Sequence, residues 1–310
     1  MKVRGILGPD VRDTKAIDIL GRVVEWRPGE LWWEADPRHV ERILETTGMV
    51  SGNASVVPGV KIQEEDGDIA GLVGNELTMY RSVTARANFI AQDRPDIRYA
   101  VKDLCRDMAK PTRASMRKLK KLARYLKGHP RMVQKIKTHE DANDKGEITV
   151  FVDSDWAGCT ATRRSTNGGC IIFGGACMKT WSTTQGVVAL SSGEAEYYAA
   201  VKGASEGLGF QAACQDLGMG NMTVRVLTDS SACKGICQRT GLGKIRHIDV
   251  ALLWLQDLVR KGRVVMKKIP GARNLADLLT KYLAGSKTSE ITEELGFHVE
   301  EGRTKIVDKA

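Results

Sequence analysis

Four acidic residues are placed where their side chains could hold divalent cations: Asp153, Glu194, Asp229 and Asp277. Asp153 and Asp229 each close an apolar run that is typical of a strand. Ligands of α/β sheets gather at the carboxyl ends of strands, so these two acids converge if their strands are neighbours. Carboxylate oxygens are the ligands that Mg²⁺ prefers. The two strand-end acids are therefore candidates for a site that binds a divalent cation.

Each acid also has a structural interpretation. Glu194 completes a capping box with Ser191, which explains it without chemistry. Asp229 can cap a helix that follows it, and Asp277 can pair with Arg273 or Lys281 one turn away.

Two further acids lie close in the sequence. Glu196 is two residues beyond Glu194 on a helix, so we expect it to point away from the face that Glu194 uses. Asp155 shares the face of Asp153 only if the strand continues through it. We expect Asp155 to support the site from its edge.

The elements that would position these acids follow in a clear order. Three strand-like runs precede a long helix, and strands and helices then alternate, over residues 148–153, 169–173, 177–182, 192–217, 224–228, 230–238, 249–261, 264–269 and 274–282. This order predicts an α/β fold with a mixed sheet flanked by helices.

A basic segment lies upstream. Residues 110–137 hold eleven Lys or Arg and no acid. Apolar residues recur within it at helical spacing from Met116 to Leu126, so an amphipathic helix that ends near Gly128 is expected. A solvated face usually mixes charges of both signs, and we therefore favour phosphate contact over plain solvation. The contact residues would be Arg117, Lys120, Lys121, Arg124 and Lys127.

The whole chain fits two domains and a polyanionic partner. Its 310 residues suffice for two cores, and its net charge is +9. The seven cysteines form no Cys-x-x-Cys pair, and no apolar run reaches the ~20 residues of a membrane span. We expect a reduced, intracellular protein without a membrane partner, either cytoplasmic or nuclear.

Several motifs resemble one family in one order. They are Asp153-Ser-Asp-Trp-Ala-Gly158, Thr180-Trp-Ser182, Val188-Ala-Leu-Ser-Ser-Gly-Glu-Ala-Glu-Tyr197, Lys244-Ile-Arg-His-Ile-Asp249 and Leu275-Ala-Asp-Leu-Leu-Thr-Lys281. Upstream, Arg94-Pro-Asp-Ile-Arg-Tyr-Ala-Val101 and Arg124-Tyr-Leu-Lys-Gly128 belong to the same pattern. The chain resembles the C-terminal part of the Pol polyprotein of copia-type LTR retrotransposons, with the end of a reverse transcriptase and a ribonuclease H domain.

The resemblance implies a fold, a reaction and a ligand set. It implies a ribonuclease H-like mixed five-stranded sheet flanked by helices, after a truncated and mainly helical reverse-transcriptase remnant. It implies an endonuclease for the RNA strand of RNA/DNA hybrids, with Asp153, Glu194, Asp229 and Asp277 holding two Mg²⁺ that Mn²⁺ can replace. Trp156, Trp181, Ser191 and His247 would contact nucleic acid beside the basic helix.

Together, pattern and resemblance divide the chain into five segments. They are a palm remnant of hairpin and helix (1–52), a linker (53–75), a basic helical region (76–138), a ribonuclease H-like domain (147–284) and a C-terminal tail (285–310). No Tyr-x-Asp-Asp motif of a polymerase palm occurs, so we expect no DNA synthesis from this chain alone and an upstream palm as a partner in a polyprotein.

Two alternative functions stay open at this point. The absent palm motif also fits a non-catalytic, nucleic-acid-binding remnant of a degraded element. Asp153-Ser-Asp155 also fits the metal motif of a nucleotide-sugar glycosyltransferase, although that leaves Asp229, Asp277 and the basic helix unexplained.

Overall fold

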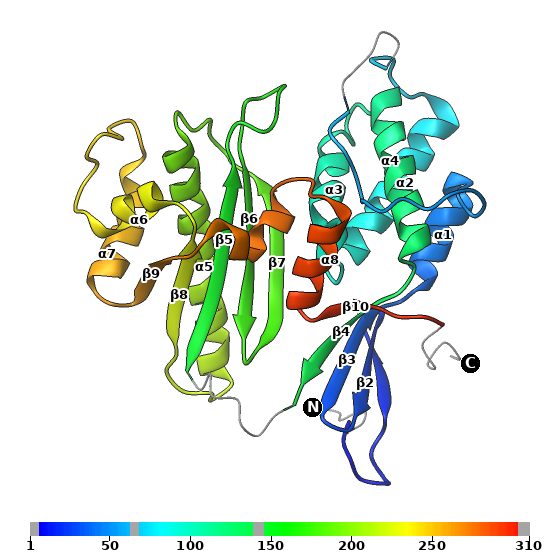
Figure 1. Ribbon diagram of the computed structural model, residues 1–310, viewed down its shortest axis with the longest axis horizontal. Helices are drawn as coiled ribbons and strands as arrows, with labels where there is room; N and C mark the ends of the chain where they lie inside the picture. Colours follow the sequence, from blue (N-terminus) through cyan, green and yellow to red (C-terminus); the bar gives the residue numbers. More distant parts are fainter. Residues whose placement is uncertain (1–5, 63–67, 139–145, 303–310) are drawn as a thin grey trace. The chain divides into compact units, whose positions relative to one another are not determined.

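The computed structural model describes residues 6–62, 68–138 and 146–302. The chain divides into two compact units (Figure 1). Unit 1 comprises residues 1–140 and 282–310, and unit 2 comprises residues 141–281. Most of the polar stretch where a boundary was expected, at 139–145, lies outside the described residues.

Unit 2 is built on a mixed five-stranded sheet. Its strands are β5 (Glu147–Asp155), β6 (Thr166–Phe173), β7 (Ala176–Thr184), β8 (Thr223–Thr228) and β9 (Val264–Lys268), in the order β7-β6-β5-β8-β9. β5, β6 and β7 pair antiparallel, whereas β8 runs parallel to both β5 and β9. The expected α/β fold with a mixed five-stranded sheet is confirmed.

The helical elements of unit 2 connect and flank these strands. They are α5 (Ser192–Asp216), α6 (Ser231–Gln238), α7 (Trp254–Arg260) and the 3₁₀ turns η1 (Val250–Leu253), η2 (Gly271–Arg273) and η3 (Leu275–Leu279). Figure 1 shows α5 along one face of the sheet, where it contacts β5, β6 and β8.

Two glycines permit the close approach of α5 to the sheet. A Cβ atom on Gly203 would lie 2.3 Å from Val152 Cγ1, and one on Gly207 would lie 2.7 Å from Val224 Cγ1. Both valines are fully buried in the core of the unit. The face of α5 that carries these glycines is therefore fixed against β5 and β8.

Unit 1 combines an antiparallel sheet with a helical cluster. The sheet has the order β1-β2-β3-β4-β10, from β1 (Ala16–Ile19), β2 (Arg22–Arg27), β3 (Glu30–Ala35), β4 (Met132–Lys137) and β10 (Phe297–Val299). The helices are α1 (Arg38–Thr47), α2 (Gly74–Ile90), α3 (Pro95–Arg106), α4 (Arg113–Gly128) and α8 (Gly285–Glu294). The predicted hairpin corresponds to β2 and β3, and the predicted basic helix is α4.

The expected division of the first half differs from the structure. The supposed palm remnant and the basic helical region form one unit, since β4 pairs with β3 and α1 packs on α2 and α4. The supposed linker is bonded to the same unit: Ser55 N–H donates to the Arg124 carbonyl at 3.0 Å, and Leu72 N–H donates to the Pro111 carbonyl at 2.8 Å.

The supposed C-terminal tail is also an integral part of unit 1. Its residues form α8 and then β10, which pairs antiparallel with β4. Ile291, Leu295 and Phe297 are buried there. The segment holds few apolar residues, and the pairing partner of β10 lies far upstream, so the sequence did not indicate this role.

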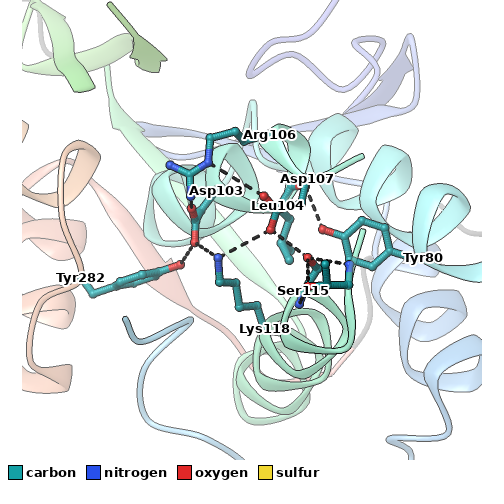
Figure 2. A network of polar contacts seen from close by, with 9 residues as sticks. Tyr80, Asp103, Leu104, Arg106, Asp107, Ser115, Lys118 and Tyr282 are labelled. Carbon is teal, nitrogen blue, oxygen red and sulfur yellow. Dashed lines mark hydrogen bonds and ion pairs between the residues drawn. The ribbon is translucent and has the colours of Figure 1, made fainter. Parts of the chain in front are cut away.

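A polar network ties α3, α4 and the returning chain together within unit 1 (Figure 2). The Asp103 carboxylate accepts a hydrogen bond from the Tyr282 hydroxyl at 3.1 Å and lies 3.1 Å from Lys118 Nζ. Lys118 also approaches Asp107, which accepts from the Ser115 hydroxyl at 2.9 Å. Tyr282 is thus anchored one residue after unit 2 ends.

No described helix has both the length and the apolar composition that a membrane span requires.

Candidate metal centre

Three carboxylates converge at the carboxyl end of the β5–β8 pair. One oxygen each of Asp153, Asp229 and Asp277 lies within 4.8 Å of the others. Asp153 is in β5, Asp229 directly follows β8, and Asp277 is in η3. β5 and β8 are parallel neighbours, so their carboxyl ends meet at one edge, as the strand-end argument predicts.

Asn274 brings η3, and with it Asp277, to this edge. Its side chain is buried, and its Nδ2 donates to the Val152 carbonyl at 3.0 Å, directly before Asp153. Its Oδ1 caps η3 by accepting from Ala276 N–H at 3.2 Å. A Cβ atom at Gly168 of β6 would lie 2.5 Å from Thr280 Cγ2, so glycine gives the end of η3 room on the sheet.

Burial and like charges disfavour the ionised carboxylates. Burial raises the pKa of Asp153 to about 6, with the charges of Asp277 and Asp229 adding to it, while a hydrogen bond from the Thr280 hydroxyl and the Lys281 ammonium oppose the rise. The pKa of Asp229 is raised by burial and then by Asp277. These carboxylates therefore need positive charge to stay ionised together.

Lys281 supplies part of that charge. Its Nζ lies 2.8 Å from Asp277 Oδ1 and 3.9 Å from Asp153 Oδ2. Burial alone would lower the pKa of Lys281, but the neighbouring Asp277 and Asp153 raise it. The pairing with Asp277 expected as the structural alternative is present together with the cluster.

The donor set fits a hard divalent cation. Its members are oxygens of carboxylates that converge from three separate segments and are partly withdrawn from water. Such oxygens suit Mg²⁺ or Mn²⁺, and the repulsion between them is relieved by bound positive charge.

Glu196, not Glu194, is the glutamate that faces this cluster. Glu196 accepts from Ser154 N–H at 3.2 Å and from the Ser154 hydroxyl at 3.1 Å, directly beside Asp153. Burial raises the pKa of Glu196 to about 8, and the charges of Asp153 and Asp229 add to this. As expected, Glu196 and Glu194 use different faces of α5, but the face that packs on the sheet is that of Glu196, so Glu194 was the wrong choice for the cluster.

A sequence signal for Glu196 was present but not used. Ala200, Gly203 and Gly207 follow Glu196 at intervals of 4, 7 and 11 residues, which places them on one face of a helix. Small residues at this spacing mark the face of α5 that approaches the sheet closely. The local capping pattern around Ser191 indicated only where the helix begins.

Glu194 is buried in a separate arrangement. Its Oε2 accepts from Leu190 N–H at 3.0 Å and lies 2.8 Å from His247 Nε2, and its Oε1 accepts from the Tyr198 hydroxyl at 3.0 Å. The capping alternative is partly realised, because the Ser191 hydroxyl accepts from Glu194 N–H at 3.2 Å. The assignment of Glu194 to the carboxylate cluster is therefore corrected.

The other predicted residues separate into exposed and buried positions. Trp156 is half-exposed, and its Nε1 donates to the Ala189 carbonyl at 3.0 Å, while Ser191 is exposed at the start of α5. Trp181 is in the core, where it packs over Gly169, so its prediction as a nucleic-acid contact was wrong. Asp155 shares the face of Asp153, since β5 continues through it, but it lies outside the cluster, ~6.6 Å further along the strand.

The basic helix α4 presents fewer open cations than its sequence indicates. Arg117 pairs with Asp68, and Lys127 Nζ donates to the Gly52 carbonyl at 2.6 Å. Lys120 and Arg124 are exposed, and Lys121 is half-buried. Acidic residues from elsewhere in unit 1 thus neutralise some of the cations in this segment, which contains no acid itself. The prediction of phosphate contact rests on the remaining cations, Lys120, Lys121 and Arg124.

Comparison with known proteins finds relatives of this chain among transposon proteins. No family model matches the chain. An uncharacterized mitochondrial protein of Arabidopsis thaliana is 32% identical over 60% of this chain and 75% of its own length. The retrovirus-related Pol polyprotein from transposon TNT 1-94 of Nicotiana tabacum is 28% identical over 96% of this chain, and that from transposon RE1 of Arabidopsis thaliana is 26% identical over 84%.

The chain is similar to retrovirus-related Pol polyproteins from transposons over most of its own length. It spans 23% and 18% of the length of the two Pol polyproteins. Among solved structures, LC11-RNase H1 from compost is 21% identical, with a TM-score of 0.32 over 44% of this chain and 93% of that one. The same protein in complex with an RNA/DNA hybrid is 18% identical, with a TM-score of 0.30 over 43% and 93%. Unit 2, to which the carboxylate cluster belongs, is the part of the chain with the mixed five-stranded sheet in the order β7-β6-β5-β8-β9.

Proposed function

We propose that unit 2 is an endonuclease that hydrolyses the RNA strand of RNA/DNA hybrids with two magnesium ions. The observation that carries the proposal is the convergence of Asp153, Asp229 and Asp277, with Glu196 beside them, at one sheet edge. These four acids would hold the ions. Two such ions, when bound, stabilise negative charge on the attacking and leaving oxygens of a phosphodiester.

The side chains around the acids keep the carboxylates in place. The Thr280 hydroxyl donates to Asp153, and Ser154 donates to Glu196 through both its N–H and its hydroxyl. Lys281 balances the charge of Asp277 and Asp153. Carboxylates fixed in this way need little reorganisation when cations bind, which favours reaction.

Selectivity for an RNA strand would come from contact with 2′-hydroxyls across a wide minor groove. Trp156 and Ser191 are exposed near the carboxyl end of β5 and the start of α5, where such a groove could bind. Lys120, Lys121 and Arg124 of α4 would add a sequence-independent hold on phosphates. In the same proposal the chain works inside the cell, within a polyprotein whose palm domain lies elsewhere.

The deciding experiment is a cleavage assay with a labelled RNA/DNA hybrid and magnesium. Asp229→Asn should lose at least ~100-fold in rate, equivalent to about 2.7 kcal/mol of transition-state stabilisation. The control is Asp216→Asn, an exposed aspartate at the end of the same helix as Glu196, which should cleave like the unaltered chain. Equal cleavage by Asp229→Asn and the unaltered chain would refute the proposal.

Duplex DNA and single-stranded RNA serve as substrate controls. We expect neither to be cut at a comparable rate. Binding of hybrid without cleavage in magnesium or manganese would instead support the non-catalytic remnant.

A further inference from the structure

Glu194 is a buried carboxylate that the proposed chemistry does not use. Its side chain is 1% exposed and its two oxygens meet three donors, from Leu190, Tyr198 and His247. Leu190 and Tyr198 are local to α5, whereas His247 comes from a distant segment. A buried acid is tolerated when donors satisfy its oxygens, so this arrangement is specific and rigid.

The segment that provides His247 is a loop, residues 239–249, between α6 and η1. It has no regular secondary structure. Its backbone is held by turn hydrogen bonds, such as that from Ile248 N–H to the Ile245 carbonyl at 3.2 Å, and at Gly241 by the buried Gln256 side chain, which accepts from the N–H at 2.9 Å and donates to the carbonyl at 3.1 Å. Ile248 is buried in the core. Ordering a loop costs backbone entropy for each residue, so side-chain anchors decide which conformation the loop adopts.

The loop carries two exposed cations on either side of its partly buried Ile245. Lys244 and Arg246 are both exposed, and His247 follows directly. The bond from His247 to Glu194 therefore fixes the part of the loop that presents these charges.

The bond between Glu194 and His247, the anchor of the loop, also sets where Lys244 and Arg246 lie. Glu194 and Glu196 lie two residues apart on α5, within a single helical turn, and one turn rises ~5.4 Å. Glu196 in turn bonds to Ser154 beside Asp153. Through this short path the loop is attached to the same end of α5 that borders the carboxylate cluster.

We propose that Glu194 is a positioning residue that, through His247, holds the loop of residues 239–249 so that Lys244 and Arg246 bind the phosphate backbone of the nucleic acid. The proposal rests on the proposed function for the identity of the ligand. Exposed cations fixed in one place neutralise phosphates without first having to be ordered, which strengthens binding and makes it depend on salt.

The test measures two quantities on the full chain. Hybrid affinity is measured by fluorescence anisotropy in the absence of divalent metal, and single-turnover cleavage is measured at saturating hybrid with magnesium. We expect Glu194→Gln and His247→Ala each to weaken Kd about 10-fold at low salt and to change the saturating rate by less than about 3-fold.

The cations are tested by a double variant, Lys244→Ala with Arg246→Ala. It should weaken Kd similarly and reduce the slope of log Kd against log salt by about 2, close to ~0.9 for each lost phosphate contact. Adding His247→Ala to it should weaken Kd no further, because the anchor then has no charges to position. Arg263→Ala, which removes an exposed cation of unit 2 outside the loop, is the matched control and should leave Kd unchanged.

His247→Gln separates anchoring from general loss of structure. Its amide can still donate to Glu194, so it should recover part of the affinity that His247→Ala loses. An unchanged Kd in Glu194→Gln, or a loss of rate without a loss of affinity, would overturn the positioning role. If the chain binds hybrid but never cuts it, the proposed nuclease activity is refuted, and the Kd values of the variants still decide the role of the loop. If the chain does not bind hybrid, both the nuclease activity and the role of the loop are refuted.

Discussion

At the start of α5, two glutamates separated by one residue have unlike surroundings. Glu196 bonds to Ser154 and feels the charges of Asp153 and Asp229, whereas Glu194 is satisfied by Leu190, Tyr198 and His247. Which of two such residues faces a sheet depends on the rotation of the helix about its axis. That rotation is set by contacts far along α5, so a motif of a few residues did not reveal it.

The residue types and strand ends nevertheless predicted most of the cluster. Asp153 and Asp229 could be predicted because parallel neighbouring strands end at one edge, a consequence of strand order alone. Thr280 and Asn274 were not found, since each acts through a contact with a strand more than a hundred residues upstream. Their roles depend on how η3 lies on the sheet.

The stability of the metal-free protein should fall as pH rises. Folding raises the pKa of Asp153 to about 6 and that of Glu196 to about 8, so both bind protons more tightly in the folded state. Their contribution to the free energy of unfolding is complete below the unfolded pKa values near 4. As the pH rises, the contribution of Asp153 is lost by about pH 6 and that of Glu196 by about pH 8. We expect the Tm in EDTA to fall between pH 5 and 8.

Glu196→Gln removes one of these groups and should flatten the fall between pH 6 and 8. Added magnesium should flatten the profile of the unaltered chain for the same reason, because bound charge stabilises the ionised acids. Melting curves at several pH values measure both effects, with Asp216→Asn as the control. Identical profiles for Glu196→Gln and Asp216→Asn would contradict the assignment of Glu196 to the cluster.

Among the elements, α5 connects the core of unit 2 with its site. One end of α5 bears Glu196, and its middle packs through Gly203 against Val152, the residue before Asp153. The sequence predicted the helix itself, with its cap at Ser191. It did not predict how closely the helix approaches the sheet, because a glycine in a helix can also mean only that the helix is weak.

Gly203→Ala should destabilise unit 2. The new methyl group would meet Val152 Cγ1 at 2.3 Å, and overpacking of this kind costs ~1–3 kcal/mol. The measured Tm should fall by several degrees, about 2 to 4 °C for each kcal/mol.

Gly209→Ala on the same helix is the control. It has no atom within 4 Å of the added methyl group, and it should stabilise by ~0.5–1 kcal/mol through helix propensity. If both variants raise the Tm, the tight approach of α5 is not present in solution.

For the molecule as a whole, the segment after unit 2 completes unit 1. β10 adds a strand to β4, and Ile291, Leu295 and Phe297 are buried. A pattern search treats residues 285–310 as a tail because the segment contains few apolar residues. Its importance lies in long-range pairing.

Removal of residues 285–310 should unfold unit 1. Three buried apolar side chains contribute ~1.5–3 kcal/mol each, a sum comparable to the whole stability of a domain. Limited proteolysis should then degrade residues 6–138 while a fragment from unit 2 persists. Removal of residues 303–310 alone is the control, and equal protease resistance of the two truncated chains would contradict the role of α8 and β10.

Unit 2 is an insertion, since the chain leaves unit 1 before residue 141 and returns at Tyr282. The first strand of unit 2, β5, begins at Glu147. The unit ends at Lys281, whose side chain lies beside Asp153, six residues further along β5. At ~3.3 Å per strand residue, the two ends of the unit are therefore about 20 Å apart. Loop-closure entropy grows with the length of chain that must be closed. Early folding of unit 2 would replace a loop of about 140 flexible residues by a short rigid span, so unit 1 should fold faster when unit 2 is already formed.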